Sequence, residues 1–256
     1  MPVDNGSFRY GYGLFETMLL RNGRIRLAQY HWERLFASMQ TLSFEPPPLM
    51  TPAKLEGEVL RTASKNGLSS LCRVRLQVFA AGGGMYGLES TAPGYVIECF
   101  PLPEEMIALN ENGLVAGMAK GLRKSADLLS PLKSANALIY ALAARQAKTN
   151  KWNDALIYNT EGHIIESTLA NIFWEKNGTI YTPPLADGCV AGVMRRHLLA
   201  KVPGIQERSL TTEILAEAKA VFLTNAIRTV RWISDIAGNN YQRSLAAQVY
   251  NVLSAD

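Results

Sequence analysis

The chain has 256 residues, of which 48% are hydrophobic and 19% are charged, and 26 basic against 22 acidic residues give a formal net charge of +4. This composition is typical of a globular protein with one large or two small domains, and the mild basic excess without a dense Lys/Arg run argues against nucleic-acid binding. No stretch reaches the roughly 20 apolar residues of a membrane helix, and the scattered histidines and cysteines lack the spacing of a metal site. We therefore expect a cytoplasmic protein that binds a small molecule, with neither a nucleic acid nor a membrane as partner.

Strand and helix patterns alternate in the N-terminal part of the chain. Asn22-Gly23 lies between two strand-like runs and predicts a tight hairpin. Thr51-Pro52 is a typical helix start, and Gly67 is a typical residue just beyond a helix end. The predicted strands are 14–20, 24–27, 72–79 and 94–100, and the predicted helices are 28–41 and 51–66.

The second half of the chain is richer in strands. A glycine- and lysine-rich segment, residues 120–130, is predicted to be a loop, and an Ala- and Leu-rich helix is predicted to follow it over 135–149. This order predicts an α/β (α+β) protein with a small N-terminal α/β domain over 1–110 and a larger, β-rich C-terminal domain over 111–256. The further predicted elements are strands at 155–158, 164–165, 170–174, 179–182 and 220–224, a helix that opens within 188–195, and a terminal helix from about 244.

Several polar residues stand where they could carry chemistry. Lys133 follows a proline-containing loop and precedes a helix, so its amine could point into a cleft, where partial burial would favour the neutral form that Schiff-base chemistry needs. Glu166 ends an apolar strand and would require a partner if buried, such as a protonated pyridine nitrogen. A solvated lysine and an edge glutamate are the simpler alternatives.

Two further features could bind a phosphate group. Gly192-Val193-Met194 opens a predicted helix, whose free backbone N–H groups would suit a phosphate. Arg34, on the first predicted helix, could add a bidentate contact. Taken alone, each is equally compatible with an ordinary helix start or a surface arginine.

Together, in this order, these residues resemble the class IV aminotransferases, which are pyridoxal-phosphate (PLP) enzymes of fold type IV. The resemblance extends from about residue 9 to about residue 236. The matching motifs are 10–17 (Y-G-D-G-x-F-E-T in the family), 31–35 (H-x-x-R-L), 132–136 around Lys133, 154–174 with Glu166 and an N-x-F, 182–185 (T-P-x-L), 192–195 (G-x-x-R) and 220–226 (A-x-E-x-F-x-x-N-A).

The resemblance implies a set of cofactor residues. Lys133 would carry PLP as a Schiff base and act as the catalytic base and acid, and Glu166 would pair with the pyridine nitrogen. Phosphate contacts would come from Arg34 and the Gly192-Val193-Met194 backbone, and Asn225 and Ala226 would line the same site. It also implies a homodimer, and two domains with the cofactor in the cleft between them.

The match has departures that bear on the substrate. Tyr12 replaces the aspartate of the family's Y-G-D-G motif, and Leu138 stands where the family has a tyrosine beyond the lysine. Tyr12 is therefore a candidate substrate residue, together with three arginines that could bind carboxylates: Arg73, Arg75 and Arg228.

Three activities share this scaffold: branched-chain aminotransferase, D-amino-acid aminotransferase and 4-amino-4-deoxychorismate lyase, which forms 4-aminobenzoate and pyruvate for folate synthesis. The compact length, residues 171–174 and Asn225-Ala226 look more like the lyase. A homologue that keeps the fold but only binds ligands is a further alternative, although retention of Lys133, Glu166 and Arg34 argues against it.

Overall fold

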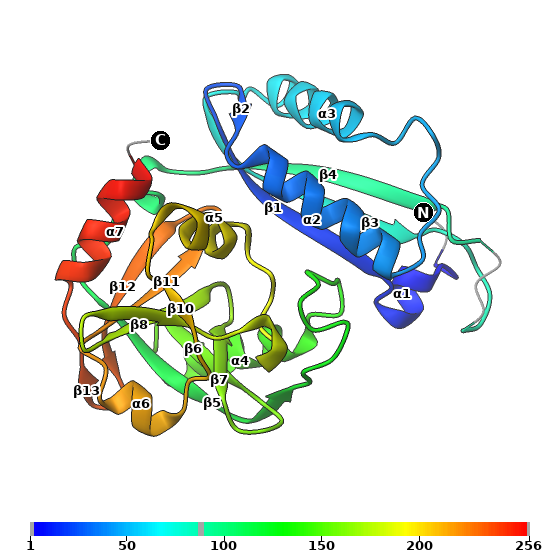
Figure 1. Ribbon diagram of the computed structural model, residues 1–256. Coiled ribbons are helices and arrows are strands. Elements are labelled where there is room, and N and C mark those ends of the chain that lie inside the picture. Colours follow the sequence, from blue (N-terminus) through cyan, green and yellow to red (C-terminus); the bar gives the residue numbers. More distant parts are fainter. Residues whose placement is uncertain (1–2, 87–89, 255–256) are drawn as a thin grey trace. The chain divides into compact units, whose positions relative to one another are not determined.

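The computed structural model describes residues 3–86 and 90–254, which form two compact units (Figure 1). The first comprises Met1–Met106 and Leu132–Asn136, and the second comprises Ile107–Pro131 and Ala137–Asp256. The division after Met106 lies close to the predicted boundary at 110. Leu132–Asn136, predicted to lie in the C-terminal domain, instead belongs to the first unit because its backbone extends a sheet there: Phe15 N–H donates to the Lys133 carbonyl at 2.9 Å.

The first unit is an antiparallel sheet covered by helices. Its strands run in the order β2-β1-β3-β4. Asn22 and Gly23 both have positive φ, at 49° and 71°, which confirms the predicted hairpin. The elements are α1 (Gly6–Tyr10), β1 (Gly13–Arg21), β2 (Arg24–Ile25), α2 (Ala28–Thr41), α3 (Pro52–Lys65), β3 (Leu71–Ala80), β4 (Pro93–Pro101) and the 3-10 turn η1 (Glu104–Met106).

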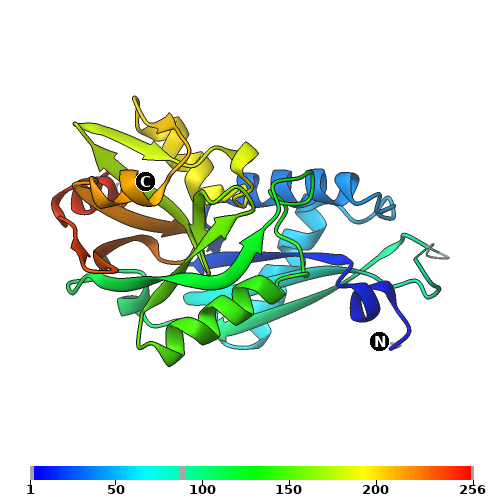
Figure 2. The same cartoon turned by 90° about the horizontal axis from the view of Figure 1, so that it is seen from below.

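Alternation along β1 and β3 decides which face of this sheet is covered. Leu14, Met18, Val74 and Leu76 are fully buried in one apolar cluster with residues of α2 and α3. Side chains on the other face, such as Arg75, keep partial exposure. Both helices lie on the same side of the sheet (Figures 1 and 2).

The second unit is built around a sheet that closes on itself. Its strands follow the order β10-β9-β8-β11-β12-β5-β6-β7, and a further pairing of β7 with β8 closes the ring. The elements are β5 (Leu114–Lys124), α4 (Leu138–Thr149), β6 (Asp154–Asn159), β7 (Ile164–Ser167), β8 (Asn171–Lys176), β9 (Thr179–Thr182), η2 (Leu185–Asp187), α5 (Val193–Lys201), β10 (Gln206–Glu207), α6 (Thr212–Ala216), β11 (Ala220–Asn225), β12 (Thr229–Ile236), β13 (Asn239–Asn240) and α7 (Ser244–Ser254).

Apolar residues pack on both faces of the curved sheet. Leu156, Ile172 and Leu223 belong to a large cluster formed by several strands of the ring. Ala155 and Ile157, their alternating neighbours on β6, pack instead against α4. The mixed α+β architecture agrees with the expected fold class.

The main error of the sequence interpretation concerns β5. Residues 120–124 were predicted as part of a loop, yet they continue a strand. The glycines and lysines reflect a bulge: the register between β5 and β6 shifts between Met118 and Arg123, and Gly121 has a φ of +70°. The helix predicted from 135 begins at Leu138, and β12 was not predicted at all.

Within the part of the chain that the structure describes, no helix has both the length and the apolar character needed to cross a membrane.

Candidate active site

Glu166 lies on the outer side of the closed sheet, at the end of β7. It is paired across the strands with Ile157, and opposite residues of neighbouring strands point to the same face. Since Ile157 packs under α4, Glu166 faces that helix too, and only 3% of its surface is exposed. The sequence left open whether Glu166 is buried with partners or exposed at a sheet edge, and the structure shows that it is buried.

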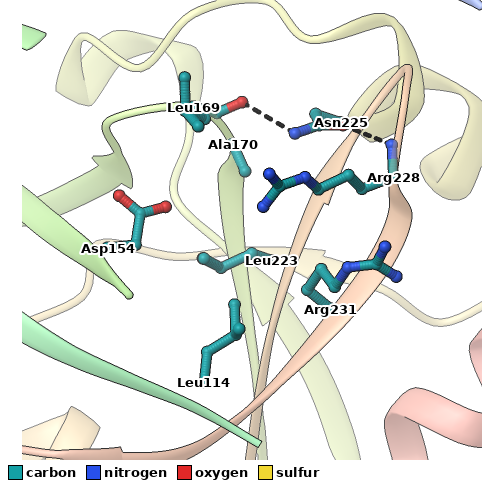
Figure 3. A pocket seen from close by; sticks show the side chains of 8 residues that line it. All are labelled: Leu114, Asp154, Leu169, Ala170, Leu223, Asn225, Arg228 and Arg231. Atoms are coloured by element: carbon teal, nitrogen blue, oxygen red, sulfur yellow. Dashed lines mark hydrogen bonds between the residues drawn. The ribbon is translucent and has the colours of Figure 1, made fainter. Parts of the chain in front are cut away.

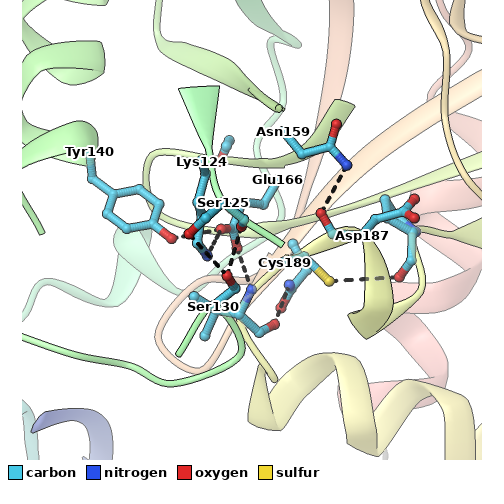
Figure 4. A network of polar contacts seen from close by, with 12 residues as sticks. Lys124, Ser125, Ser130, Tyr140, Asn159, Glu166, Asp187 and Cys189 are labelled. Carbon is cyan, nitrogen blue, oxygen red and sulfur yellow. Dashed lines mark hydrogen bonds and ion pairs between the residues drawn. The ribbon is translucent and has the colours of Figure 1, made fainter. Parts of the chain in front are cut away.

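Three donors hold the Glu166 carboxylate (Figure 4). Lys124 Nζ and the Tyr140 hydroxyl each donate to Oε1 at 2.7 Å, and the Val190 backbone N–H donates to Oε2 at 2.9 Å. Burial and the neighbouring carboxylate raise the pKa of Tyr140 far above its usual range, so its hydroxyl stays protonated and donates. A carboxylate has about four lone-pair sites, so one site on Oε2 remains for a further donor.

The turn that follows Glu166 is fixed from several sides. Thr168 donates from its hydroxyl to Asp154 Oδ1 at 2.5 Å, and its backbone N–H donates to the Ala155 carbonyl at 3.1 Å. Asn225 Nδ2 donates to the Leu169 carbonyl at 3.2 Å. Asn225 thus connects the β11–β12 turn to the turn beside Glu166.

The N-terminus of α5 lies next to this carboxylate. Val190, whose N–H contacts Glu166, accepts a hydrogen bond at its carbonyl from Asn171 Nδ2 at 2.9 Å. Gly192 is the N-cap of α5, and as a glycine it has no side chain that could accept from the first N–H groups of that helix. A Cβ at Gly192 would come within 1.9 Å of Asn171 Oδ1, so only glycine fits there. The segment can therefore offer backbone N–H groups to an anion.

Lys133 lies in the first unit, beside an aromatic ring. Its Nζ is 4.4 Å from the centre of the Phe15 ring, and the guanidinium carbon of Arg75 is 4.0 Å from the same centre. Arg75 also donates to Gln77 Oε1 at 2.8 Å, and its Nε lies 3.9 Å from Glu98. Two candidate residues, a lysine and an arginine, therefore share one aromatic platform.

Arg34 is engaged by a carboxylate of its own unit. Its Nε donates to Glu16 Oε1 at 2.7 Å and its Nη2 to Glu16 Oε2 at 2.5 Å, while His31 Nδ1 lies 2.6 Å from the same oxygen. Burial raises the pKa of Glu16, but the charges and hydrogen bonds of Arg34 and His31 outweigh burial and bring that pKa to about 2. Arg34 is thus held rigidly by an ion pair.

The remaining candidate residues are dispersed. The Tyr12 hydroxyl donates to the Leu42 carbonyl, and its ring packs on Phe44. Arg73 lies over the Phe100 ring at 4.5 Å. Arg228 shares a small pocket with Asn225 and Arg231 (Figure 3).

Arg231 is the more buried arginine of that pocket. Its side chain donates to the Ala108 and Val230 carbonyls. Burial and the charge of Arg228 lower the pKa of Arg231 to about 10. Asn225 accepts from the backbone N–H of Arg228 at 2.8 Å, so it orders the turn that carries Arg228.

A family model described as amino-transferase class IV matches residues 13–236. The chain belongs to the class IV aminotransferase family. Its members are PLP-dependent enzymes, and so is this protein.

Individual relatives divide between two activities. The chain is 28% identical to an aminodeoxychorismate lyase of Vibrio harveyi, over 93% of this chain and 88% of the relative. It is 32% identical to a putative branched-chain-amino-acid aminotransferase of Methanocaldococcus jannaschii, over 91% and 82%. A solved structure of a putative 4-amino-4-deoxychorismate lyase from Legionella pneumophila superposes with a TM-score of 0.88 at 26% identity, covering 100% of this chain and 94% of that one.

The second unit fits what PLP requires. The remaining lone pair of Glu166 can accept from a protonated ring nitrogen, and the α5 N-terminus suits the phosphate. Val190 connects the two features, since it contacts both Glu166 and Asn171. When bound, PLP supplies an electron sink for a carbanion at the substrate carbon that bears the amine.

Sequence reasoning missed three residues that hold candidate side chains, one in the first unit and two in the second. Glu16 was quoted within a motif, but its role as the buried partner of Arg34 was not inferred, although a charge inside an apolar strand is a signal for pairing. Lys124 was missed because residues 120–130 were predicted to form a loop, whereas Lys124 is the last residue of β5. Tyr140 carries no local signal, because only the packing of α4 on β6 brings its hydroxyl to Glu166.

Replacing Gly192 with alanine should disturb the N-terminus of α5. The new methyl group would collide with Asn171, so we expect Gly192→Ala to lose about 1–3 kcal/mol of stability and to bind PLP more weakly. Urea unfolding and cofactor titration measure the two effects. Gly57→Ala is the matched control, because Gly57 lies in α3 with nothing within 4 Å of an added Cβ, and it should be neutral or slightly stabilising. Equal behaviour of the two variants would contradict this account.

The buried Glu16 carboxylate, with its partners Arg34 and His31, should make the free energy of unfolding depend on pH in the acidic range. A lowered carboxyl pKa stabilises the fold above the unfolded value of 4.5, and this contribution disappears as the pH falls towards 2. We expect Glu16→Gln to remove most of this dependence, on the order of 3 kcal/mol, and to be less stable at pH 7 as well. Urea midpoints at pH 7 and near pH 3 provide the measurement. Glu45→Gln, at an exposed position, should retain the wild-type profile, and a Glu16→Gln profile as steep as wild type would rule the explanation out.

Proposed function

We propose that the protein is a 4-amino-4-deoxychorismate lyase that releases pyruvate and 4-aminobenzoate. The observation that carries this proposal is the shared platform of Phe15, where the Lys133 amine and the Arg75 guanidinium lie over one ring. A flat substrate with carboxylates needs an aromatic surface, a cation and a base, and this platform supplies all three. Similarity to the Vibrio harveyi and Legionella pneumophila proteins supports the same choice.

Each residue has a defined task in this proposal. Lys133 would hold the cofactor through its ε-amine, and the same lysine amine, once free, would take up and return the proton at the reacting carbon of the substrate. Glu166 accepts from the pyridine nitrogen with its remaining lone pair. Gly192-Val193-Met194 and Arg34 hold the phosphate.

Asn225 and Ala226 complete the proposed cofactor site. Asn225 already orders the turn beside Glu166 through Leu169, and this supports a positioning role for it. We further propose a cytoplasmic homodimer that serves folate synthesis, an expectation that rests on the family resemblance. Size-exclusion chromatography with light scattering tests the dimer, and a mass of a single chain would refute it.

Among the substrate candidates, we assign the carboxylate anchor to Arg75. It lies on the same ring as Lys133, whereas Arg73 lies over a different ring, that of Phe100. Burial lowers the pKa of Arg75, and the charge of the nearby Glu98 opposes this effect. The side chain keeps 32% of its surface exposed, so a carboxylate could reach it.

The second candidate function is a branched-chain aminotransferase. The 32% identity to the Methanocaldococcus jannaschii relative favours it. A D-amino-acid aminotransferase is the third. The Arg75 guanidinium lies on the same ring as the Lys133 amine, and this favours a substrate that carries a carboxylate over an aliphatic one.

The purified protein should be yellow when loaded with PLP. Borohydride should bleach the band and fix the cofactor on Lys133, as peptide mass spectrometry would show, and Lys133→Ala should prevent fixation. Formation of pyruvate and 4-aminobenzoate from aminodeoxychorismate would establish the lyase. Amino transfer to 2-oxoglutarate without lyase turnover would establish an aminotransferase instead, and fixation on another lysine would refute the Lys133 assignment.

Arg75→Leu should raise KM for aminodeoxychorismate by roughly 10- to 100-fold, because a charge-assisted hydrogen bond is worth about 1.5–3 kcal/mol. Steady-state kinetics give KM and kcat separately. Arg73→Leu, a neighbouring arginine on the same strand and sheet face, is the matched control and should change KM little. A larger effect at Arg73 than at Arg75 would overturn the assignment.

A further inference from the structure

Lys124 has no task in the proposed reaction, yet it contacts the Glu166 carboxylate directly. Its Nζ lies 2.7 Å from Glu166 Oε1, and only 11% of its side chain is exposed. It also lies 5.4 Å from the centre of the Tyr140 ring. An ammonium group placed this deeply costs desolvation, so the site tolerates it only because of its carboxylate partner.

A bulge in the β5 backbone sets the direction of the Lys124 side chain. The β5 bulge, where Gly121 has a left-handed φ of +70°, ends just before Arg123, and Lys124 then pairs with Asn159. Without the bulge the alternation along β5 would be out of register with β6 at this end of the strand. A bulge beside a functional site commonly serves to aim a side chain.

The placement has an electrostatic consequence for the cofactor. Tyr140 and Val190 are neutral donors, so Lys124 is the one cation among the described donors to Glu166. A protonated pyridine nitrogen on Oε2 would be a second cation on the same carboxylate. The two positive charges would share one counter-ion, and each would weaken the binding of the other.

We propose that Lys124 is a positioning residue that neutralises Glu166 in part and thereby limits how tightly the site holds and protonates the pyridine nitrogen of PLP. This inference rests on the proposed pairing of Glu166 with that nitrogen. Lys124 then keeps the Glu166 carboxylate in place and at the same time reduces its affinity for the protonated pyridine ring.

The test measures PLP binding to the ligand-free protein together with the protonation of the ring nitrogen, by fluorescence or absorbance titration and by NMR of ¹⁵N-labelled PLP. Lys124→Met should bind PLP roughly tenfold more tightly and keep the nitrogen protonated to a pH about one unit higher. Lys124→Arg, which retains the charge, should resemble wild type. Glu166→Gln should shift both readouts in the opposite direction.

Lys124→Gln keeps a donor for Oε1 without the charge and should act like Lys124→Met, so it carries the test if the methionine variant does not fold. Unchanged or weaker binding in the neutral variants would overturn the inference, since a merely structural lysine would only weaken the site. Failure of the proposed function looks different: the wild-type protein would not take up PLP, and Glu166→Gln would have no effect.

Discussion

The buried carboxylate of Glu166 is the interaction on which the candidate site depends. A carboxylate removed from water must be compensated by donors, and here three elements supply them: β5 through Lys124, α4 through Tyr140 and the segment before α5 through Val190. Loss of one donor would leave a buried charge undercompensated, which costs several kcal/mol in comparable sites. The same carboxylate therefore contributes to the local fold and to chemistry.

Closure of the sheet explains why these donors meet. β7 and β8 are joined by a short turn and pair directly at Glu166 and Asn171, so these two side chains have little freedom. Asn171 then fixes Val190 and excludes any side chain at Gly192. The Glu166 carboxylate and the N-terminus of α5 are thus both positioned by one strand pairing, and rigid elements of this kind position a site better than loops do.

The two faces of the sheet in the first unit place different residues in different surroundings. Its sheet buries one face against α2 and α3 and leaves the other partly exposed, so polar residues can stand there without desolvation of their entire surface. Phe15 provides the surface on which Lys133 and Arg75 lie. Glu16, its neighbour in sequence, points to the buried face by alternation and binds Arg34 there. One strand thus carries both an aromatic ring that contacts two cations and a carboxylate in a buried ion pair.

Much of this protein could be inferred from local patterns. The hairpin at Asn22-Gly23, the helices of the first unit and most strands of the second follow from turn residues, caps and alternation, which are short-range effects. The family resemblance, spread over many motifs, gave the cofactor and the expected role of Lys133. Glu166 was suspected because a charge in an apolar strand needs a partner.

The sequence did not indicate which residues are the partners of Glu166. Lys124 lies 42 residues from Glu166 along the chain and Tyr140 lies 26, and a β-bulge disguised the strand that carries Lys124 as a loop. Local patterns in the sequence indicated most of the strands, and the family resemblance indicated the cofactor and its candidate residues. Tertiary structure alone decided which cation shares the Glu166 carboxylate, because that contact depends on strand register and helix packing between segments that are distant in sequence.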